Sequence, residues 1–262
     1  MFVHSQLFWD LFWPPAPPAP SVFRQALLDN DISTAQALMV SGEAEILEAA
    51  GNNLALAIDL DRDLELIRAM IDQSDLETLN HTNDVPAIHA AARCANATVV
   101  ELLIQAAANV LIRDRVQRAP LFSAVVLSRT NMGRGQDQTL FPKVVQTVRL
   151  LIEHGAIVNH ESPGLVLIPR YCICCKDASL PIDPNLVTLL VAEGAHTPPK
   201  NWLDMECPMQ ANAANAAIEE GRLYRDAPPI LRSELERVLL PPLLAIIADY
   251  VYVPINQAPT NT

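Results

Sequence analysis

Residues 85–114 read VPAIHAAARCANATVVELLIQAAANVLIRD, and this stretch decides which fold the sequence predicts. Ile88 and Ala91 place apolar groups on one side of a first short helix. A second helix follows, in which apolar residues recur at helical spacing between Val99 and Ile104. Because alanine at a crossing point lets two helix axes approach closely, we expect a packed antiparallel pair of short helices.

The same pattern recurs along the chain at a nearly constant spacing. The apolar anchors of the first helices are Phe23, Leu54, Ile88 and Leu121. They are separated by 31, 34 and 33 residues, and a period of about 33 is typical of stacked helix-turn-helix repeats. We therefore predict an all-α solenoid of about five to six such units, joined by short β-turn fingers.

At these residues the chain resembles the ankyrin repeat family. Pro86–Ala92 stands where the family has T-P-L-H-x-A-A, and Leu102–Val110 resembles its closing run. Ala107 occupies the place of the family's glycine, where alanine has a steric cost at positive φ. The resemblance covers roughly residues 21–200 and is strongest over residues 85–159.

We divide the chain into an N-terminal segment (residues 1–20), a repeat domain (21–200) and a C-terminal part (201–262). An insertion at about residues 128–143 separates the two helices of the fourth unit. The first helix of the fifth unit, near Ile168–Ile173, is degenerate in sequence. In the C-terminal part we predict a divergent sixth unit, whose alanine-rich helix from Met209 ends at Gly221 and the prolines that follow, and then a helical cap.

The N-terminal segment differs in composition from the rest of the chain. Its aromatic and leucine residues precede a proline run, PPAPPAP, that cannot continue a helix. One interpretation is an interfacial anchor or partner-binding peptide with Trp9 and Trp13 as the buried groups. The other is a short helix that covers the exposed face of the first repeat. We favour the cap, because no basic residue accompanies the aromatics.

Composition excludes several classes of function. The net charge of −12 argues against nonspecific nucleic-acid binding and against docking on an anionic membrane. Five cysteines do not form a disulfide framework, which favours a reducing compartment. The sequence has no apolar run long enough to span a membrane and no secretory signal. We expect a cytoplasmic, monomeric protein.

The residues that could act in catalysis or bind a metal fit structural roles better than catalytic ones. The family resemblance implies that His89 bonds to turn backbone of neighbouring repeats, and no nucleophile stands near it at recognisable spacing. Cys172, Cys174 and Cys175 could bind zinc with Cys207 or His196, as in a metal-dependent enzyme, but their spacing differs from a zinc knuckle. No phosphate loop, nucleophile elbow or dinucleotide fingerprint occurs. We predict a non-enzymatic protein without a cofactor.

The ankyrin resemblance implies that a protein partner binds at the concave side, on hairpin tips and first-helix faces. The partner-binding residues that this implies are Asn83, Asp84, Arg93, Arg115, Gln117, Arg118 and Arg129, with Ser123 on the same helix faces. Arginine clustered on an acidic chain suits an acidic peptide, through bidentate carboxylate contacts. The alternative is that these tips are simply solvated.

A second resemblance lies near the C-terminus, in LPPLLAIIADYV at residues 240–251. It is similar to the opening of F-box motifs, which end many ankyrin proteins of intracellular bacteria and large DNA viruses and dock the adaptor of cullin-type ubiquitin ligases. It is one residue shorter and lacks the motif's acidic residue. The implied ligase-docking residues are Leu240, Pro241, Leu244, Ile247 and Tyr250. The chain could thus be a microbial effector in a host cytosol or a ubiquitin-ligase substrate adaptor; otherwise this helix caps the last repeat.

Overall fold

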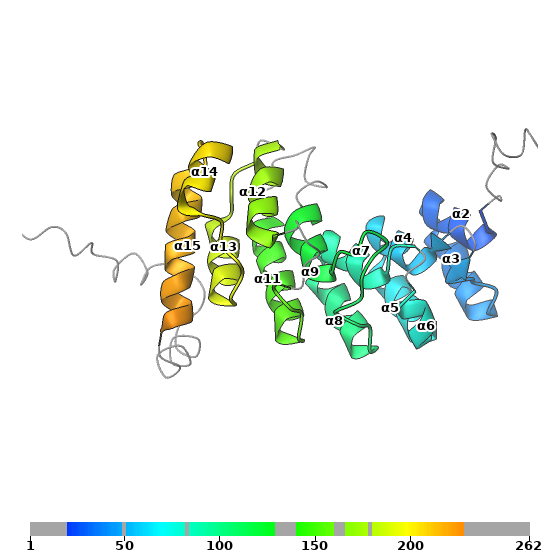
Figure 1. Ribbon diagram of the computed structural model, residues 1–262. Coiled ribbons are helices and arrows are strands. Elements are labelled where there is room, and N and C mark those ends of the chain that lie inside the picture. Colours follow the sequence, from blue (N-terminus) through cyan, green and yellow to red (C-terminus); the bar gives the residue numbers. More distant parts are fainter. Residues whose placement is uncertain are drawn as a thin grey trace, which may run out of the picture. The chain divides into compact units, whose positions relative to one another are not determined.

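A computed structural model describes residues 20–48, 51–81, 84–128, 140–159, 166–177 and 180–227 (Figure 1). The chain divides into two compact units, Met1–Ile157 and Val158–Thr262. The described residues are mostly helical, which confirms the predicted all-α class. None of the described helices is long and apolar enough to cross a membrane.

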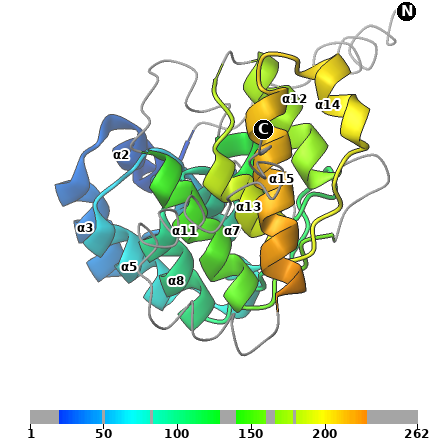
Figure 2. The ribbon, with the colours of Figure 1, turned by 90° about the vertical axis from the view of Figure 1, so that its left-hand side faces the viewer.

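The first unit is a stack of helix pairs (Figures 1 and 2). The pairs are α2 (Val22–Asp29) with α3 (Ile32–Ser41), α4 (Asn53–Asp59) with α5 (Leu64–Gln73), α7 (Ala87–Arg93) with α8 (Ala97–Gln105), and α9 (Pro120–Phe122), continued by the π-helical turn η1 (Ser123–Leu127), with α11 (Leu140–Glu153). A short helix, α6 (Leu76–Leu79), follows α5. Each first helix packs on the next first helix, α2 on α4, α4 on α7 and α7 on η1, and the second helices form a parallel series from α3 to α11.

The core follows the predicted periodicity. The anchors Phe23, Leu54, Ile88 and Leu121 are all buried. In α7, Ala91 and Ala92 are buried as well, so small side chains fill the contact between neighbouring first helices. Burial of one apolar stripe on each helix is what stabilises short helices that would be marginal alone.

Polar side chains set where the helices begin and how the turns close. Asp31, Asp63 and Asn96 are the N-caps of α3, α5 and α8, and each accepts a hydrogen bond from a backbone N–H of the first turn. After α8, Ala107 has φ 66°, in the left-handed region where Gly155 stands after α11 with φ 92°. The predicted left-handed turn at Ala107 is therefore confirmed, and its alanine is strained relative to glycine.

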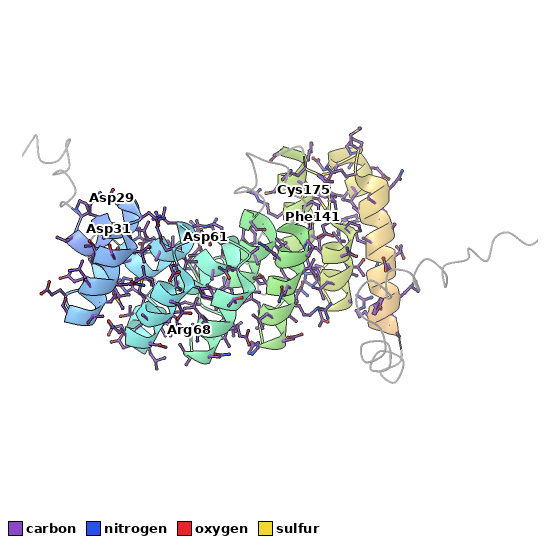
Figure 3. All side chains as sticks on the ribbon, turned by 180° about the vertical axis from the view of Figure 1, so that it is seen from behind. Asp29, Asp31, Asp61, Arg68, Phe141 and Cys175 are labelled. Atoms are coloured by element: carbon purple, nitrogen blue, oxygen red, sulfur yellow. The ribbon has the colours of Figure 1, made fainter. Side chains whose placement is uncertain are left out.

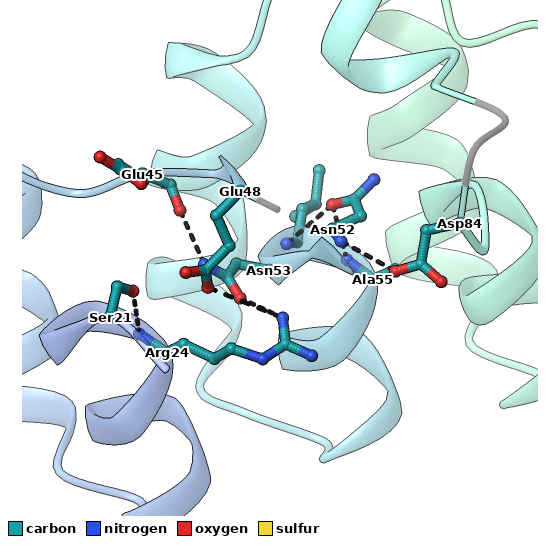
Figure 4. A network of polar contacts seen from close by, with 9 residues as sticks. Ser21, Arg24, Glu45, Glu48, Asn52, Asn53, Ala55 and Asp84 are labelled. Atoms are coloured by element: carbon teal, nitrogen blue, oxygen red, sulfur yellow. Dashed lines mark hydrogen bonds and ion pairs between the residues drawn. The ribbon is translucent and has the colours of Figure 1, made fainter. Parts of the chain in front are cut away.

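The first finger connects α3 to α4 and contains a two-stranded hairpin. Strand β1 (Leu47–Glu48) pairs antiparallel with β2 (Gly51–Asn52). Figure 4 shows how polar side chains join three successive repeats there. Arg24 donates to Asn53 Oδ1 at 2.7 Å and forms an ion pair with Glu48, while the backbone N–H of Asn52 donates to the Asp84 carboxylate at 2.9 Å. The finger is thereby fixed on both sides.

The second unit contains α12 (Leu167–Asp177), α13 (Pro184–Ala192), α14 (Lys200–Glu206) and α15 (Ala211–Asp226). Although its sequence looked degenerate, α12 is a regular helix. The predicted end of the alanine-rich helix is wrong at Gly221, because α15 continues through Gly221 to Asp226, and right for the prolines, because the helix ends just before Pro228. A Cβ on Gly221 would lie within 3 Å of the Val191 side chain and the Thr188 carbonyl on α13. Glycine here allows α13 and α15 to pack closely.

Several predictions concern residues outside the described part of the chain. These are the aromatic segment before Pro20, the insertion apart from Ser128 and residues 140–143, and the F-box-like segment at residues 240–251. Of the predicted insertion, residues 140–143 belong to α11.

Candidate protein-binding finger

The finger between α8 and α9 is held in place by His89. Its ring, 2% exposed, lies 2.8 Å from Ser123 Oγ through Nδ1 and 3.0 Å from the Ile112 carbonyl oxygen through Nε2. A carbonyl can only accept, so Nε2 carries the proton and Nδ1 accepts from the Ser123 hydroxyl. Burial lowers the pKa of His89, which favours this neutral form. The predicted structural role of His89 is confirmed.

The His89–Ser123 pair has the separation of a base and a nucleophile, but its surroundings do not suit catalysis. Both side chains are almost fully buried, and the group that orients the ring is a backbone carbonyl. A substrate atom would have to reach both groups at hydrogen-bond distance. The expectation that Ser123 is offered on a helix face is also wrong, because Ser123 is 1% exposed.

The tip of this finger is organised by Asp114. We call residues 113–118 the arginine finger. The Asp114 carboxylate accepts from the backbone N–H groups of Val116 and Arg118, at 3.0 and 2.9 Å, and from Arg118 Nε at 2.7 Å. Burial alone would raise the pKa of Asp114, but the hydrogen bonds from Arg118 lower it overall. Arg113 closes the turn by donating to the carbonyl of Gln117, whose φ is 63°.

This closed turn exposes Arg115, Val116 and Gln117 at its tip. The Val116 side chain is 58% exposed. Arg113 and Arg118 bond within the finger, whereas no other described residue bonds to the Arg115 guanidinium. The arginine finger therefore presents one uncommitted cation beside one apolar side chain on a backbone that is already ordered.

Two of the other predicted partner-binding residues make contacts between repeats. Arg93 on α7 forms an ion pair with Asp59 at the end of α4, and Asp84 holds the first finger through Asn52. Asn83 and Arg129 lie outside the described residues. Of the predicted set, Arg115, Gln117 and Arg118 come together in one finger.

Sequence reasoning missed Asp114, the residue that shapes the arginine finger. An aspartate followed four residues later by an arginine was the available signal. It also missed the asparagine bonds that link successive turns. Asn80 Oδ1 accepts from the backbone N–H of Asn109 at 2.8 Å, and Asn159 contacts the backbone of Gly194 and His196 in the second unit.

The cysteines of the second unit are mostly inside helical packing. Cys172 and Cys175 on α12 are buried, as is Cys207 after α14. Within the described ranges, no group of three or more His, Cys, Asp or Glu residues is placed to hold a metal ion. Burial also raises the pKa of Cys172, which opposes the thiolate form that zinc requires. These thiols act as small apolar core groups.

Residues 83–115 match the family model of the ankyrin repeat. This match spans α7, α8 and the start of the arginine finger, including His89. The chain is also similar to the solved ankyrin repeat domain of Bcl-3, a member of the IkappaB protein family, at 18% identity and a TM-score of 0.37, over 78% of this chain and 99% of that one. No curated protein matches the chain significantly.

The ankyrin repeat is a protein–protein interaction module and is generally a non-enzymatic scaffold. The chain accordingly has the fold of a protein-binding repeat array.

Proposed function

We propose that this chain is a non-enzymatic interaction protein that binds an acidic segment of a partner protein through the arginine finger. The observation that carries the proposal is the contrast among its arginines. Arg113 and Arg118 are used inside the turn, whereas Arg115 is exposed next to the exposed Val116. A guanidinium beside an apolar contact is a typical interface anchor for a carboxylate.

The backbone of the arginine finger is already ordered, and this favours binding. Binding normally requires a loop to lose conformational freedom, and that loss opposes association. Here Asp114 and His89 already hold the backbone on either side of the tip. The partner's carboxylate would therefore meet a guanidinium whose supporting backbone does not need to rearrange.

Charge favours the arginine finger over the acidic parts of the first unit as the site for an acidic partner. The chain carries a net charge of −12. In the first finger, Glu43 and Glu45 are exposed. Figure 3 shows Asp29, Asp31 and Asp61 along one edge of the first unit, where the helices of each pair meet, and Arg68 at the opposite edge. Acidic peptides would be repelled from the first finger and this edge and attracted to the arginine finger.

The test is selection of ligands from a random displayed-peptide library on the full chain. We expect selected peptides to be rich in Asp and Glu. Binding should fall at least tenfold in Arg115→Glu, as expected for removal of an interface anchor. Arg68→Glu is the matched control, because Arg68 is also an exposed arginine of the first unit, on α5. Selected peptides that bind Arg115→Glu as tightly as they bind the unaltered chain would refute the proposal.

A second candidate function rests on the resemblance of residues 240–251 to an F-box opening. In that case the repeats hold a substrate and the tail docks a cullin-ligase adaptor, in the cytosol of the producing cell or, for a microbial effector, of a host. The test is capture of ligase subunits by the full chain and by a chain ending at Arg232. Capture lost on truncation, with the helical circular-dichroism signal retained, supports the adaptor role; unchanged capture refutes it.

A further inference from the structure

The first repeat has an open face that the later repeats lack. The first residue of each first helix shows the difference. Val22 begins α2 and is 68% exposed, whereas Asn53, which begins α4, and Ala87, which begins α7, are fully buried. Each later first helix packs against the first helix of the preceding repeat. No described repeat precedes that of α2.

The second helices show the same difference. The third and seventh residues are Leu66 and Met70 in α5, and these are buried. The corresponding residues of α8, Val99 and Leu103, are buried too. In α3 the same positions are Thr34 and Leu38, and both are only partly buried. An additional helix before α2 would complete the packing at all three positions.

The chain carries an apolar segment at the place in the sequence where such a helix would stand. In the array, the second helix of one repeat comes before the first helix of the next, as α3 comes before α4 and α8 before α9. Residues 2–13 precede α2 in the same way, and Asp10 is their only Asp, Glu, Lys or Arg. They contain Phe8, Leu11 and Phe12 at spacing i, i+3, i+4. The second helices repeat this spacing. It is found in Ala35, Leu38 and Met39 of α3, and in the buried Ile67, Met70 and Ile71 of α5.

We infer that residues 2–13 are the second helix of an incomplete repeat and dock on α2 and α3, over Val22, Thr34 and Leu38. The proline run at residues 14–20 would connect this helix to α2, as a finger connects the second helix of one repeat to the first helix of the next. At about 3.1 Å per residue it can extend roughly 20 Å, more than the roughly 15 Å length of a ten-residue helix such as α3. The aromatic residues thus pack on this chain's own first repeat, and they do not serve to bind a membrane or a partner protein.

A double-mutant cycle on the full chain tests this inference. The first change is Val22→Glu, which would be nearly neutral if Val22 were truly solvent-exposed, and a glutamate suits the start of a helix. The second is the pair Phe8→Asp and Phe12→Asp, which should release the segment. Val116→Glu is the matched control, because Val116 is another exposed valine, on the arginine finger.

We expect Val22→Glu to lower the Tm of the full chain by about 3 °C or more, because it places a charge in an apolar contact. In the chain that carries the Phe8 and Phe12 substitutions, the same change should have no effect, and Val116→Glu should have none in either chain. Equal Tm shifts from Val22→Glu in both chains would overturn the inference, because they would show that the segment and Val22 do not interact.

Tryptophan fluorescence gives a second, independent readout. In a Trp202→Phe variant the emission comes from Trp9 and Trp13 alone. We expect blue-shifted emission in buffer, a red shift in the Phe8 and Phe12 variant, and no change when neutral phosphatidylcholine vesicles are added. Emission typical of exposed tryptophan that shifts to the blue only with vesicles would overturn the inference and indicate an interfacial anchor.

Discussion

Replacing His89 with alanine should destabilise the first unit, and the structure allows the size of the effect to be worked out. The ring makes two buried hydrogen bonds, to Ser123 and to the Ile112 carbonyl, each worth about 1 kcal/mol. His89→Ala also leaves both partners buried without a bond, at about 1 kcal/mol or more each. We therefore expect the free energy of unfolding to fall by about 4 kcal/mol.

The assay is urea unfolding of the full chain followed by far-ultraviolet circular dichroism. Arg115→Ala is the control, and it should change the free energy of unfolding by no more than about 0.5 kcal/mol because its side chain is exposed. Ser123→Ala should be less destabilising in the His89→Ala background than alone, since the hydroxyl has then already lost its partner. A loss below about 1 kcal/mol for His89→Ala would refute the reasoning, because it would mean that these bonds do not hold the finger.

Four further predictions follow from individual residues. Because the pKa of His89 is lowered in the folded state, the unfolded chain binds more protons, so Tm should fall as pH drops from about 7.5 to 5.5, and less steeply in His89→Gln. Thr147→Val should stabilise by about 1 kcal/mol in urea unfolding, because the Thr147 hydroxyl is buried and has no hydrogen-bond partner among the described residues. Gly221→Ala should lower Tm despite alanine's helix propensity, because its Cβ would collide with α13. Ala107→Gly should raise the free energy of unfolding by about 0.5–1 kcal/mol, since φ is 66°.

The helix pairs could be predicted because local pattern and packing agree. The residues at the recurring anchor positions, such as Leu54 and Ile88, are buried, and each anchor lies in the first helix of a helix pair. Helix ends were less predictable. Gly221 looks like a helix terminator in sequence, yet it stays helical because the contact with α13 requires a residue without a side chain.

The binding site was only partly predictable, because the sequence does not reveal which charges are already paired. Arg93 meets Asp59 from 34 residues away, a pairing that exists only once α7 packs on α4. Arg118 is committed to Asp114 within one turn. Arg115 is distinguished from both by its position at the tip, which depends on the turn that Asp114 shapes.

The most direct test of the proposed binding site is amide hydrogen exchange of the full chain with and without an acidic peptide selected as its ligand. Our account predicts that added protection is concentrated at residues 113–118 and is absent with Arg115→Glu at the same peptide concentration. Protection centred elsewhere, on the first finger or on residues 240–251, with no change at residues 113–118, would contradict the account.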